Sequence, residues 1–290
     1  MMTTIKTFIK RHAVLLYFIL TFVLSWGSII LVVGPGVILG AKKIPEAQLP
    51  LVYVAMLVGP SIAGLLLTGL VDGGAGLRIL LARLLKWRVE MRWYAVALLT
   101  APLLATAASF ALALFSSAFL PSIMTTDTKA ALLLSGLLVG LLVGSFEELG
   151  WTGFAIPRLR LRYGLLATGL SVGFLWGAWH FLVFQESASF STPLALALLI
   201  GRLFSWLPAY RVLLVWVYER TESLLVVMLM HASLVASTLL LQPAVTGTNL
   251  LIYIIAWAAA LWIVVAVVAV ANRGQIARST FYQKMKMASR

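Results

Sequence analysis

The chain has 290 residues, of which 62% are hydrophobic and only 11% are charged, and its formal net charge is +13. Soluble domains carry about 25% charged residues, so this composition excludes an ordinary soluble protein. The apolar residues come in runs of about 20, the length of a membrane-spanning helix, without the apolar–polar alternation of barrel strands. We therefore predict an all-α, polytopic membrane bundle.

Eight apolar segments are each long enough to cross a bilayer as a helix. The first follows Lys6, Lys10 and Arg11, and its length and missing cleavage site predict a retained helix and not a signal peptide. No internal repeat or linker divides the sequence, so we predict one membrane domain over residues 1–290. The predicted spans, in chain order, cover residues 13–34, 51–71, 93–119, 130–156, 165–184, 193–217, 222–241 and 249–271.

The basic residues are distributed unevenly between the two sides of these spans. With the N-terminus inside, seventeen of the 22 Lys and Arg residues lie in inner segments, and Lys42, Lys43 and Lys129 lie outside. Cytoplasmic loops are enriched in Lys and Arg, so this bias predicts a cell-membrane protein with both termini in the cytoplasm. This rule explains the positive charge, so no nucleic-acid partner is expected. The expected partners are membrane lipids, and we expect the basic tail from Arg273 to Arg290 to contact anionic lipid.

Two patterns indicate where the chain meets the membrane interface. Residues 77–92 alternate apolar pairs with Arg and Lys at helical spacing, which predicts a helix in the cytoplasmic interface, with a solvated loop helix as the alternative. Several tryptophans lie near the ends of predicted spans, as in an aromatic belt. These are Trp26, Trp87, Trp93, Trp151 and Trp257.

Ionisable side chains inside a membrane are costly and usually face the interior of the bundle, which makes them candidate functional residues. Glu147 and Glu148 lie on the fourth predicted span, His180 on the fifth and His231 on the seventh. Two carboxylates and two imidazoles on three helices form the one constellation that is suited to chemistry. The chain has no cysteine, which excludes thiolate chemistry.

The sixth predicted span contains Arg202 and Arg211 on either side of Pro208, and we expect it to be broken or re-entrant. The two guanidinium groups could hold an acidic partner or a substrate carboxylate. Snorkelling of the arginines to the membrane surface is the favoured interpretation.

Glycine recurs at every fourth position ahead of two of the candidate residues. Small residues at this spacing allow membrane helices to pack backbone to backbone. We therefore predict that two glycine ridges bring Glu147 towards His180. The ridges are Gly136, Gly140 and Gly144 on the fourth span and Gly169, Gly173 and Gly177 on the fifth.

Depth in the membrane is a second test of this grouping. At 1.5 Å per helical residue, Glu147 lies about 16 Å and His231 about 14 Å from the cytoplasmic ends of their spans. Counted from Arg162, His180 lies about 27 Å deep, which agrees only if its helix starts late or tilts.

Adjacent helical residues point about 100° apart, so Glu147 and Glu148 cannot both face one ligand, and one is expected to support the other. A glutamate can act as a general base, one histidine can hold a water molecule, and the other can donate to an oxyanion. Alternatively, Glu147, His180 and His231 could bind zinc, although no HExxH motif is present.

Three segments that carry these residues resemble the motifs of the CPBP family of CAAX proteases and bacteriocin-processing enzymes, also called Abi. Residues 147–159 (EELGWTGFAIPRL) resemble the first motif, residues 174–180 (FLWGAWH) the second, and residues 229–233 (LMHAS) the third. The resemblance covers about residues 130–240, which it identifies as the catalytic core. A weaker likeness extends over Gly76–Leu98.

The resemblance implies an intramembrane endopeptidase of the type II CAAX prenyl endopeptidase kind, a glutamate-type enzyme classified among the metalloproteases. It implies that Glu147 and His180 activate water, that Glu148 supports Glu147 and that His231 stabilises the oxyanion. No cofactor is required in this interpretation, and zinc is the alternative. The implied substrate is a membrane-associated peptide or protein, with a lipidated or hydrophobic C-terminus as one class.

The sequence departs from the family pattern at two positions. The commoner first motif, EExxxR, has Arg where this chain has Thr152, and the third motif has Asn where this chain has Val235. That Asn is an expected oxyanion donor, for which Ser233 and Ser237 are candidate replacements. The departures favour the alternative of a catalytically weakened scaffold or bacteriocin-immunity protein. A proton-carrying transporter is a further alternative, which the lack of an internal repeat disfavours.

Overall fold

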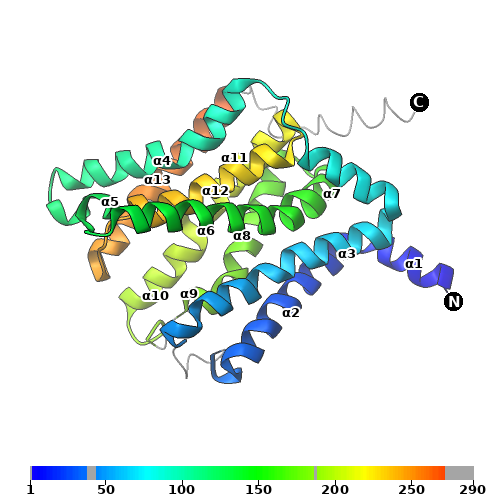
Figure 1. Cartoon of the computed structure of the whole chain (residues 1–290), viewed down its shortest axis with the longest axis horizontal. Helices are drawn as coiled ribbons and strands as arrows, with labels where there is room; N and C mark the ends of the chain where they lie inside the picture. Colours follow the sequence, from blue (N-terminus) through cyan, green and yellow to red (C-terminus); the bar gives the residue numbers. More distant parts are fainter. Residues whose placement is uncertain (1, 38–43, 186–187, 272–290) are drawn as a thin grey trace.

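The computed structural model describes residues 2–37, 44–185 and 188–271, and every regular element within these ranges is a helix. Seven helices are long and apolar enough to cross a membrane, judged by length and composition, and most of the long helices are stacked across the molecule (Figure 1). The predicted all-α, multi-pass bundle is therefore confirmed. The outer-loop residues Lys42 and Lys43 and the basic tail from Arg273 to Arg290 lie outside the described residues.

The helices follow one another with short connections. The first part of the chain contains α1 (Met2–Arg11), α2 (Ala13–Val33), η1 (Pro35–Val37), η2 (Glu46–Gln48), α3 (Leu49–Leu84), α4 (Met91–Ala113), η3 (Ser117–Phe119) and α5 (Ser122–Thr125). The second part contains α6 (Lys129–Gly150), η4 (Trp151–Ala155), α7 (Ile156–Arg160), α8 (Leu165–Trp179), α9 (Phe181–Phe184), α10 (Pro193–Ile200), η5 (Gly201–Ser205), α11 (Leu207–Thr221), α12 (Leu224–Leu241) and α13 (Gly247–Ala271).

The fifth predicted span is interrupted at a candidate catalytic residue. The 15-residue helix α8 ends at Trp179, His180 is its C-terminal cap, and α9 follows directly. Because α8 starts at Leu165, Trp176 lies about 16 Å along it, which is the depth estimated for Glu147. His180 lies about one turn further on, at about 22 Å, so the late start of the helix removes less than half of the disagreement in depth.

The sixth predicted span is broken, as the sequence indicates. α10 runs into η5, a five-residue π-helical turn, and α11 then begins at Leu207 with Pro208 in its first turn. Proline is tolerated there because the N–H it lacks would have no intrahelical partner. The break places Arg211 in the second turn of α11, deep in the protein.

The predicted interfacial helix over residues 77–92 is partly confirmed as a helix. α3 bends at Gly73, whose φ of 65° is readily adopted only by glycine, and it continues to Leu84 (Figure 1). Beyond the bend Ile79 and Leu81 are exposed, whereas residues 86–90 are not helical. Its position in the membrane interface stays a prediction.

The two glycine ridges do not meet each other, which corrects the sequence prediction. A Cβ atom on Gly144 of α6 would lie 2.6 Å from the carbonyl oxygen of Met228 in α12. A Cβ atom on Gly173 of α8 would lie 2.5 Å from Cα of Pro208 in α11. Each ridge therefore allows close backbone contact with a different helix, and α6 packs on α12 while α8 packs on α11.

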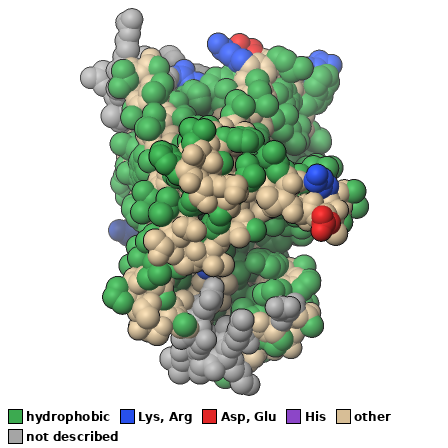
Figure 2. Space-filling model, turned by 90° about the vertical axis from the view of Figure 1, so that its left-hand side faces the viewer, with side chains coloured by type: hydrophobic (Ala, Val, Ile, Leu, Met, Phe, Trp, Pro, Cys, Tyr) green, Lys and Arg blue, Asp and Glu red, His purple; other side chains and the backbone are tan. Residues whose placement is uncertain are grey.

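The surface of the bundle is suited to lipid. The face shown in Figure 2 is largely apolar, and its few charged side chains lie mostly near the edges. Large apolar side chains are exposed on several helices, including Leu103, Leu134 and Ile263. Hydrocarbon solvates such side chains, so they cost nothing on a helix that faces the bilayer.

Candidate active site

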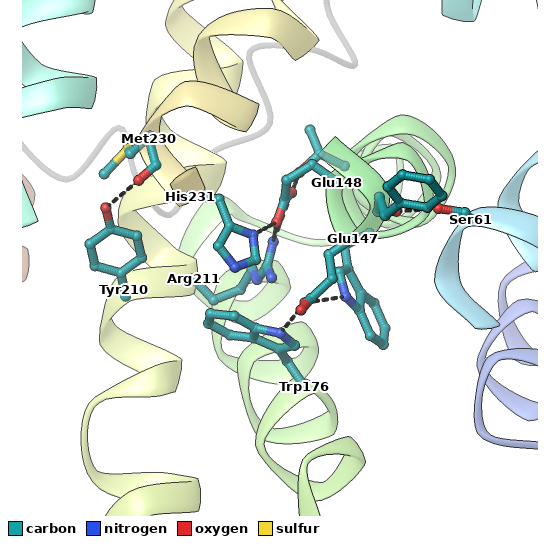
Figure 3. A network of polar contacts seen from close by, with 11 residues as sticks. Ser61, Glu147, Glu148, Trp176, Tyr210, Arg211, Met230 and His231 are labelled. Atoms are coloured by element: carbon teal, nitrogen blue, oxygen red, sulfur yellow. Dashed lines mark hydrogen bonds and ion pairs between the residues drawn. The ribbon is translucent and has the colours of Figure 1, made fainter. Parts of the chain in front are cut away.

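Three helices converge on the carboxylate of Glu148. Nδ1 of His231, on α12, lies 2.7 Å from Oε1 of Glu148, on α6 (Figure 3). Nη1 of Arg211, on α11, lies 2.8 Å and 3.0 Å from the two carboxylate oxygens. Thr152, one turn after Glu148, donates its hydroxyl hydrogen to Oε2. Both oxygens of Glu148 are therefore fully engaged within the protein.

Glu147 faces a different set of partners. Its Oε2 accepts hydrogen bonds from Nε1 of Trp176 at 2.7 Å and from Nε1 of Trp151 at 3.2 Å (Figure 3). Within the described part of the chain, Oε1 has no hydrogen-bond partner. The expectation that the two adjacent glutamates face different groups is confirmed, and Glu147 is the one with an open oxygen.

Trp176 contacts three of the four candidate catalytic residues, namely Glu147, His180 and His231. Its backbone carbonyl accepts a hydrogen bond from Nδ1 of His180 at 2.8 Å, while its indole N–H donates to Glu147. The Trp176 ring also contacts the rings of His180 and His231, with centroid distances of 5.5 Å and 5.2 Å. Because a carbonyl only accepts, we assign the hydrogen of neutral His180 to Nδ1, which leaves a lone pair on Nε2.

A direct hydrogen bond between Glu147 and His180, one form of the sequence prediction, is absent from the described residues. Glu147 binds the indole of Trp176, and His180 binds the backbone of the same residue. The two residues are thus linked through one tryptophan. A bridge through one water molecule, the other form of the prediction, stays a prediction.

Aromatic rings enclose the His180 imidazole. Trp179 contacts it edge-on at a centroid distance of 4.9 Å, and Phe184 of α9 stacks on it at 5.3 Å. The interruption between α8 and α9 allows residues on both sides of His180 to pack on its ring. Trp176 and Trp179 both contact His180 and form one wall of the site.

The polar cluster is almost completely shielded from solvent. Glu147 is 2% exposed, His231 1%, and Glu148 and Arg211 0%. An unpaired charge in such a place would be costly, so the pairing of Glu148 with Arg211 is what makes both tolerable. The Arg211 guanidinium also lies over the ring of Trp176, with Cζ 4.2 Å from the centroid. The prediction that Arg211 snorkels to the surface is therefore wrong, because a carboxylate meets it inside.

Residues 129–237 match the family model described as type II CAAX prenyl endopeptidase Rce1-like. This part of the chain is similar to that family. All three motifs lie within it, so the resemblance drawn from them is confirmed, whereas the weaker likeness at Gly76–Leu98 lies outside the matched residues. A 49-residue stretch is also 43% identical to CAAX prenyl protease 2 of Methanococcus maripaludis. That stretch makes up 17% of this chain and spans 18% of the relative's length.

Another residue supplies the missing group at one of the two positions where the matched segment departs from the family pattern. Thr152 replaces the expected Arg, and a guanidinium reaches Glu148 from Arg211 on a different helix. Near Val235, the hydroxyl of Ser233 donates to the carbonyl oxygen of Leu98 at 2.8 Å. Ser233 is therefore engaged with α4 and does not replace the missing Asn.

Zinc binding by Glu147, His180 and His231 stays a prediction. Among the described residues, no three His, Cys, Asp or Glu side chains are grouped as metal ligands. Nδ1 of His231 is bound to Glu148, and Nδ1 of His180 to a backbone carbonyl. Each histidine therefore contacts the protein through Nδ1, and in metalloproteins the ring nitrogen opposite such a bond is the one that binds a metal.

Sequence reasoning missed the contacts that three residues make in the site. Trp151 was placed in an aromatic belt, but it is 0% exposed and donates to Glu147. Its position four residues after Glu147, one helical turn away, was the available signal. Trp176 lies in the second motif and Arg211 on the sixth predicted span, but the sequence could not show that they contact Glu147 and Glu148, because those contacts join different helices.

Proposed function

We propose that this chain is an intramembrane endopeptidase that hydrolyses a peptide bond with water activated by Glu147 and His180. The observation that carries the proposal is the double role of Trp176, which orients the carboxylate of Glu147 with its indole and the imidazole of His180 with its carbonyl. The match to the Rce1-like model and the name of the Methanococcus maripaludis relative support the same reaction class.

The open groups of this pair suit a water molecule. The water donates one hydrogen bond to Oε1 of Glu147 and the other to Nε2 of His180, and its oxygen attacks the carbonyl carbon of the substrate. The proton of the attacking water passes to Glu147, and the carbonyl oxygen takes up the negative charge. When the C–N bond breaks, Glu147 returns the proton to the leaving amine, so no covalent intermediate with the protein is needed.

Glu148 and His231 have supporting roles in this mechanism. Glu148 accepts the Nδ1 hydrogen of His231, so a neutral His231 ring has only an acceptor at Nε2. Donation from Nε2 to an oxyanion therefore requires the ring to carry both hydrogens. Glu148 holds the ring in one orientation in either state, which fits its role as the supporting acid of the pair.

We propose that the substrate is a membrane-associated peptide or protein with a lipidated or hydrophobic C-terminus. The fold supports this class, because the site lies among membrane-spanning helices and its surroundings are apolar. A farnesylated peptide that ends in a CAAX sequence is the appropriate first probe. The proposed location is the cell membrane, with the termini in the cytoplasm.

A histidine substitution with a matched control tests the proposal. His180→Phe keeps a ring to stack on Phe184 but has no nitrogen to hold water, so cleavage of the farnesylated peptide should fall about 10²-fold or more. His12→Phe is the control, because His12 also packs on a phenylalanine, Phe8, at a centroid distance of 4.7 Å, but lies at the N-terminal end of α2. Equal activity of the two variants would refute the role of His180.

A scaffold or immunity protein remains the second candidate, and one observation favours it. Neither Val235 nor the engaged Ser233 supplies the expected donor in the third motif. If the folded wild-type protein cleaves neither farnesylated nor unmodified peptides, the scaffold is the better account.

A further inference from the structure

Arg211 has hydrogen-bonding capacity that the fold does not use. Its contacts with Glu148 involve only Nη1, whereas Nε and Nη2 are buried and have no hydrogen-bond partner in the described part of the protein. These two atoms carry three N–H donors. A buried N–H group without an acceptor destabilises the fold, and more so when the group is charged. The unpaired edge of Arg211 is thus suited to an acceptor from outside the chain.

This edge belongs to the same cluster as the groups proposed to activate water. The face of the Trp176 ring lies against the Arg211 guanidinium, and the indole N–H of the same ring binds Glu147. Arg211 also interacts electrostatically with Glu147 and with His180. Glu147 and His231 are almost as buried as Arg211, so a peptide that reaches them enters the same enclosed cluster.

We infer that the Nε–Nη2 edge of Arg211 donates hydrogen bonds to the carbonyl oxygen of the scissile bond as it becomes an oxyanion. Arg211 is then a further catalytic residue, outside the three motifs. The inference rests on the proposed function and adds the donor that Val235 and Ser233 do not supply. Oxyanion donors act by being fixed in place before charge develops, and a guanidinium held by Glu148 and Trp176 meets that condition.

The charges of the cluster favour an oxyanion over a carboxylate of the substrate. Glu147 and Glu148 already place two carboxylates beside one guanidinium, so a bound substrate carboxylate would add a third buried anion. Formation of the oxyanion does not add a third negative charge, because the proton of the water neutralises Glu147 as the carbonyl oxygen becomes negative. The unpaired edge of Arg211 therefore meets a negative charge that replaces the one on Glu147.

Arg211→Lys tests the inference because lysine keeps a positive charge for Glu148 but lacks the second donor edge. With the farnesylated CAAX peptide, kcat/KM should fall about 10²- to 10³-fold, the usual effect of losing an oxyanion donor. The matched control is Arg160→Lys, because Arg160 is 2% exposed and forms a 2.7 Å ion pair with Glu219 outside the cluster. The control should change thermal stability by a similar amount and leave cleavage unchanged.

Binding measurements separate a catalytic role from a structural one. A phosphonamidate analogue of the peptide, with an anionic tetrahedral centre, should lose affinity for Arg211→Lys by the same factor as kcat/KM. The uncleaved peptide should bind equally to Glu147→Gln and to the Glu147→Gln/Arg211→Lys double variant. Equal weakening of peptide and analogue would overturn the inference, because Arg211 would then bind the ground state.

Two further outcomes are decisive. If Arg211→Lys cleaves like the wild type, the unpaired edge holds only water and this inference fails, while the proposed function stands. A wild-type protein that neither cleaves the peptide nor binds the analogue refutes the proposed function itself.

If Arg211→Lys does not fold, a structure of the wild-type protein with the bound analogue tests the inference. It must place a phosphoryl oxygen within about 3.2 Å of Nε or Nη2, and an oxygen held only by other donors overturns the inference.

Discussion

Glutamine substitutions at Glu147 and Glu148 change neighbouring residues in the same way, and the structure predicts opposite results. In Glu147→Gln, the amide oxygen can still accept the hydrogen bonds from Trp151 and Trp176, because both fall on one carboxylate oxygen. Hydrogen bonds to a charged group contribute about 1.5–3 kcal/mol and neutral ones about 1 kcal/mol. Removing a buried charge offsets this loss, so stability should change by less than about 1 kcal/mol.

The same change at Glu148 breaks a buried ion pair. Arg211 would keep its charge at 0% exposure without a carboxylate, and removing one partner of such a pair costs about 3–5 kcal/mol. Glu148→Gln should therefore lower the thermal unfolding midpoint clearly, whereas Glu147→Gln should leave it nearly unchanged. Glu147→Gln should nevertheless reduce cleavage about 10²- to 10⁴-fold, because it removes the general base from a protein that still folds.

The two variants are best measured side by side in the same detergent. Thermal unfolding reports stability, and release of the C-terminal fragment from the farnesylated peptide reports activity. The expected pattern is a stable, inactive Glu147→Gln and a destabilised Glu148→Gln. If Glu147→Gln retains wild-type cleavage, it is not the base. If Glu148→Gln is as stable as the wild type, the ion pair with Arg211 does not hold the helices together.

Three further predictions concern packing, metal and topology. Gly144→Ala should strongly lower the thermal unfolding midpoint, because its Cβ would lie 2.6 Å from the Met228 carbonyl oxygen. Gly136→Ala should have a mild effect, because its Cβ meets only the Leu240 side chain, at 3.2 Å. Equal effects would contradict the packing of α6 on α12. Cleavage should persist after dialysis against a strong chelator, and a loss that zinc restores would contradict the mechanism. Tags at both termini should react only with reagents on the cytoplasmic side, and a C-terminal tag that reacts from outside would refute the orientation taken from the basic residues.

The sequence was sufficient to predict the helical membrane fold and the four ionisable candidate residues, because both depend on local patterns. Long apolar runs specify spans, and the cost of ionisable groups in lipid draws attention to Glu147, Glu148, His180 and His231. The matched residues 129–237 contain all four.

The pairing of the helices could not be read from the sequence. Glycine ridges show that α6 and α8 each pack closely on some helix, but they do not identify the partner. In the structure Gly144 of α6 packs against α12, and Gly173 of α8 packs against α11. The ridges therefore position Glu148 beside His231 and Trp176 beside Arg211. The break after Trp179 was also hidden, because the apolar run continues through His180 into α9.

The ion pair between Glu148 and Arg211 has a consequence for the biogenesis of the protein. An isolated helix with arginine at its centre inserts into a bilayer at a cost of about 2.5–3.5 kcal/mol. The helix that carries Glu148 is synthesised first, so its carboxylate is available when the segment with Arg211 leaves the ribosome. Insertion of α11 is then coupled to its assembly with α6, and a chain truncated before α11 would leave Glu148 as a buried, unpaired acid for quality control to detect.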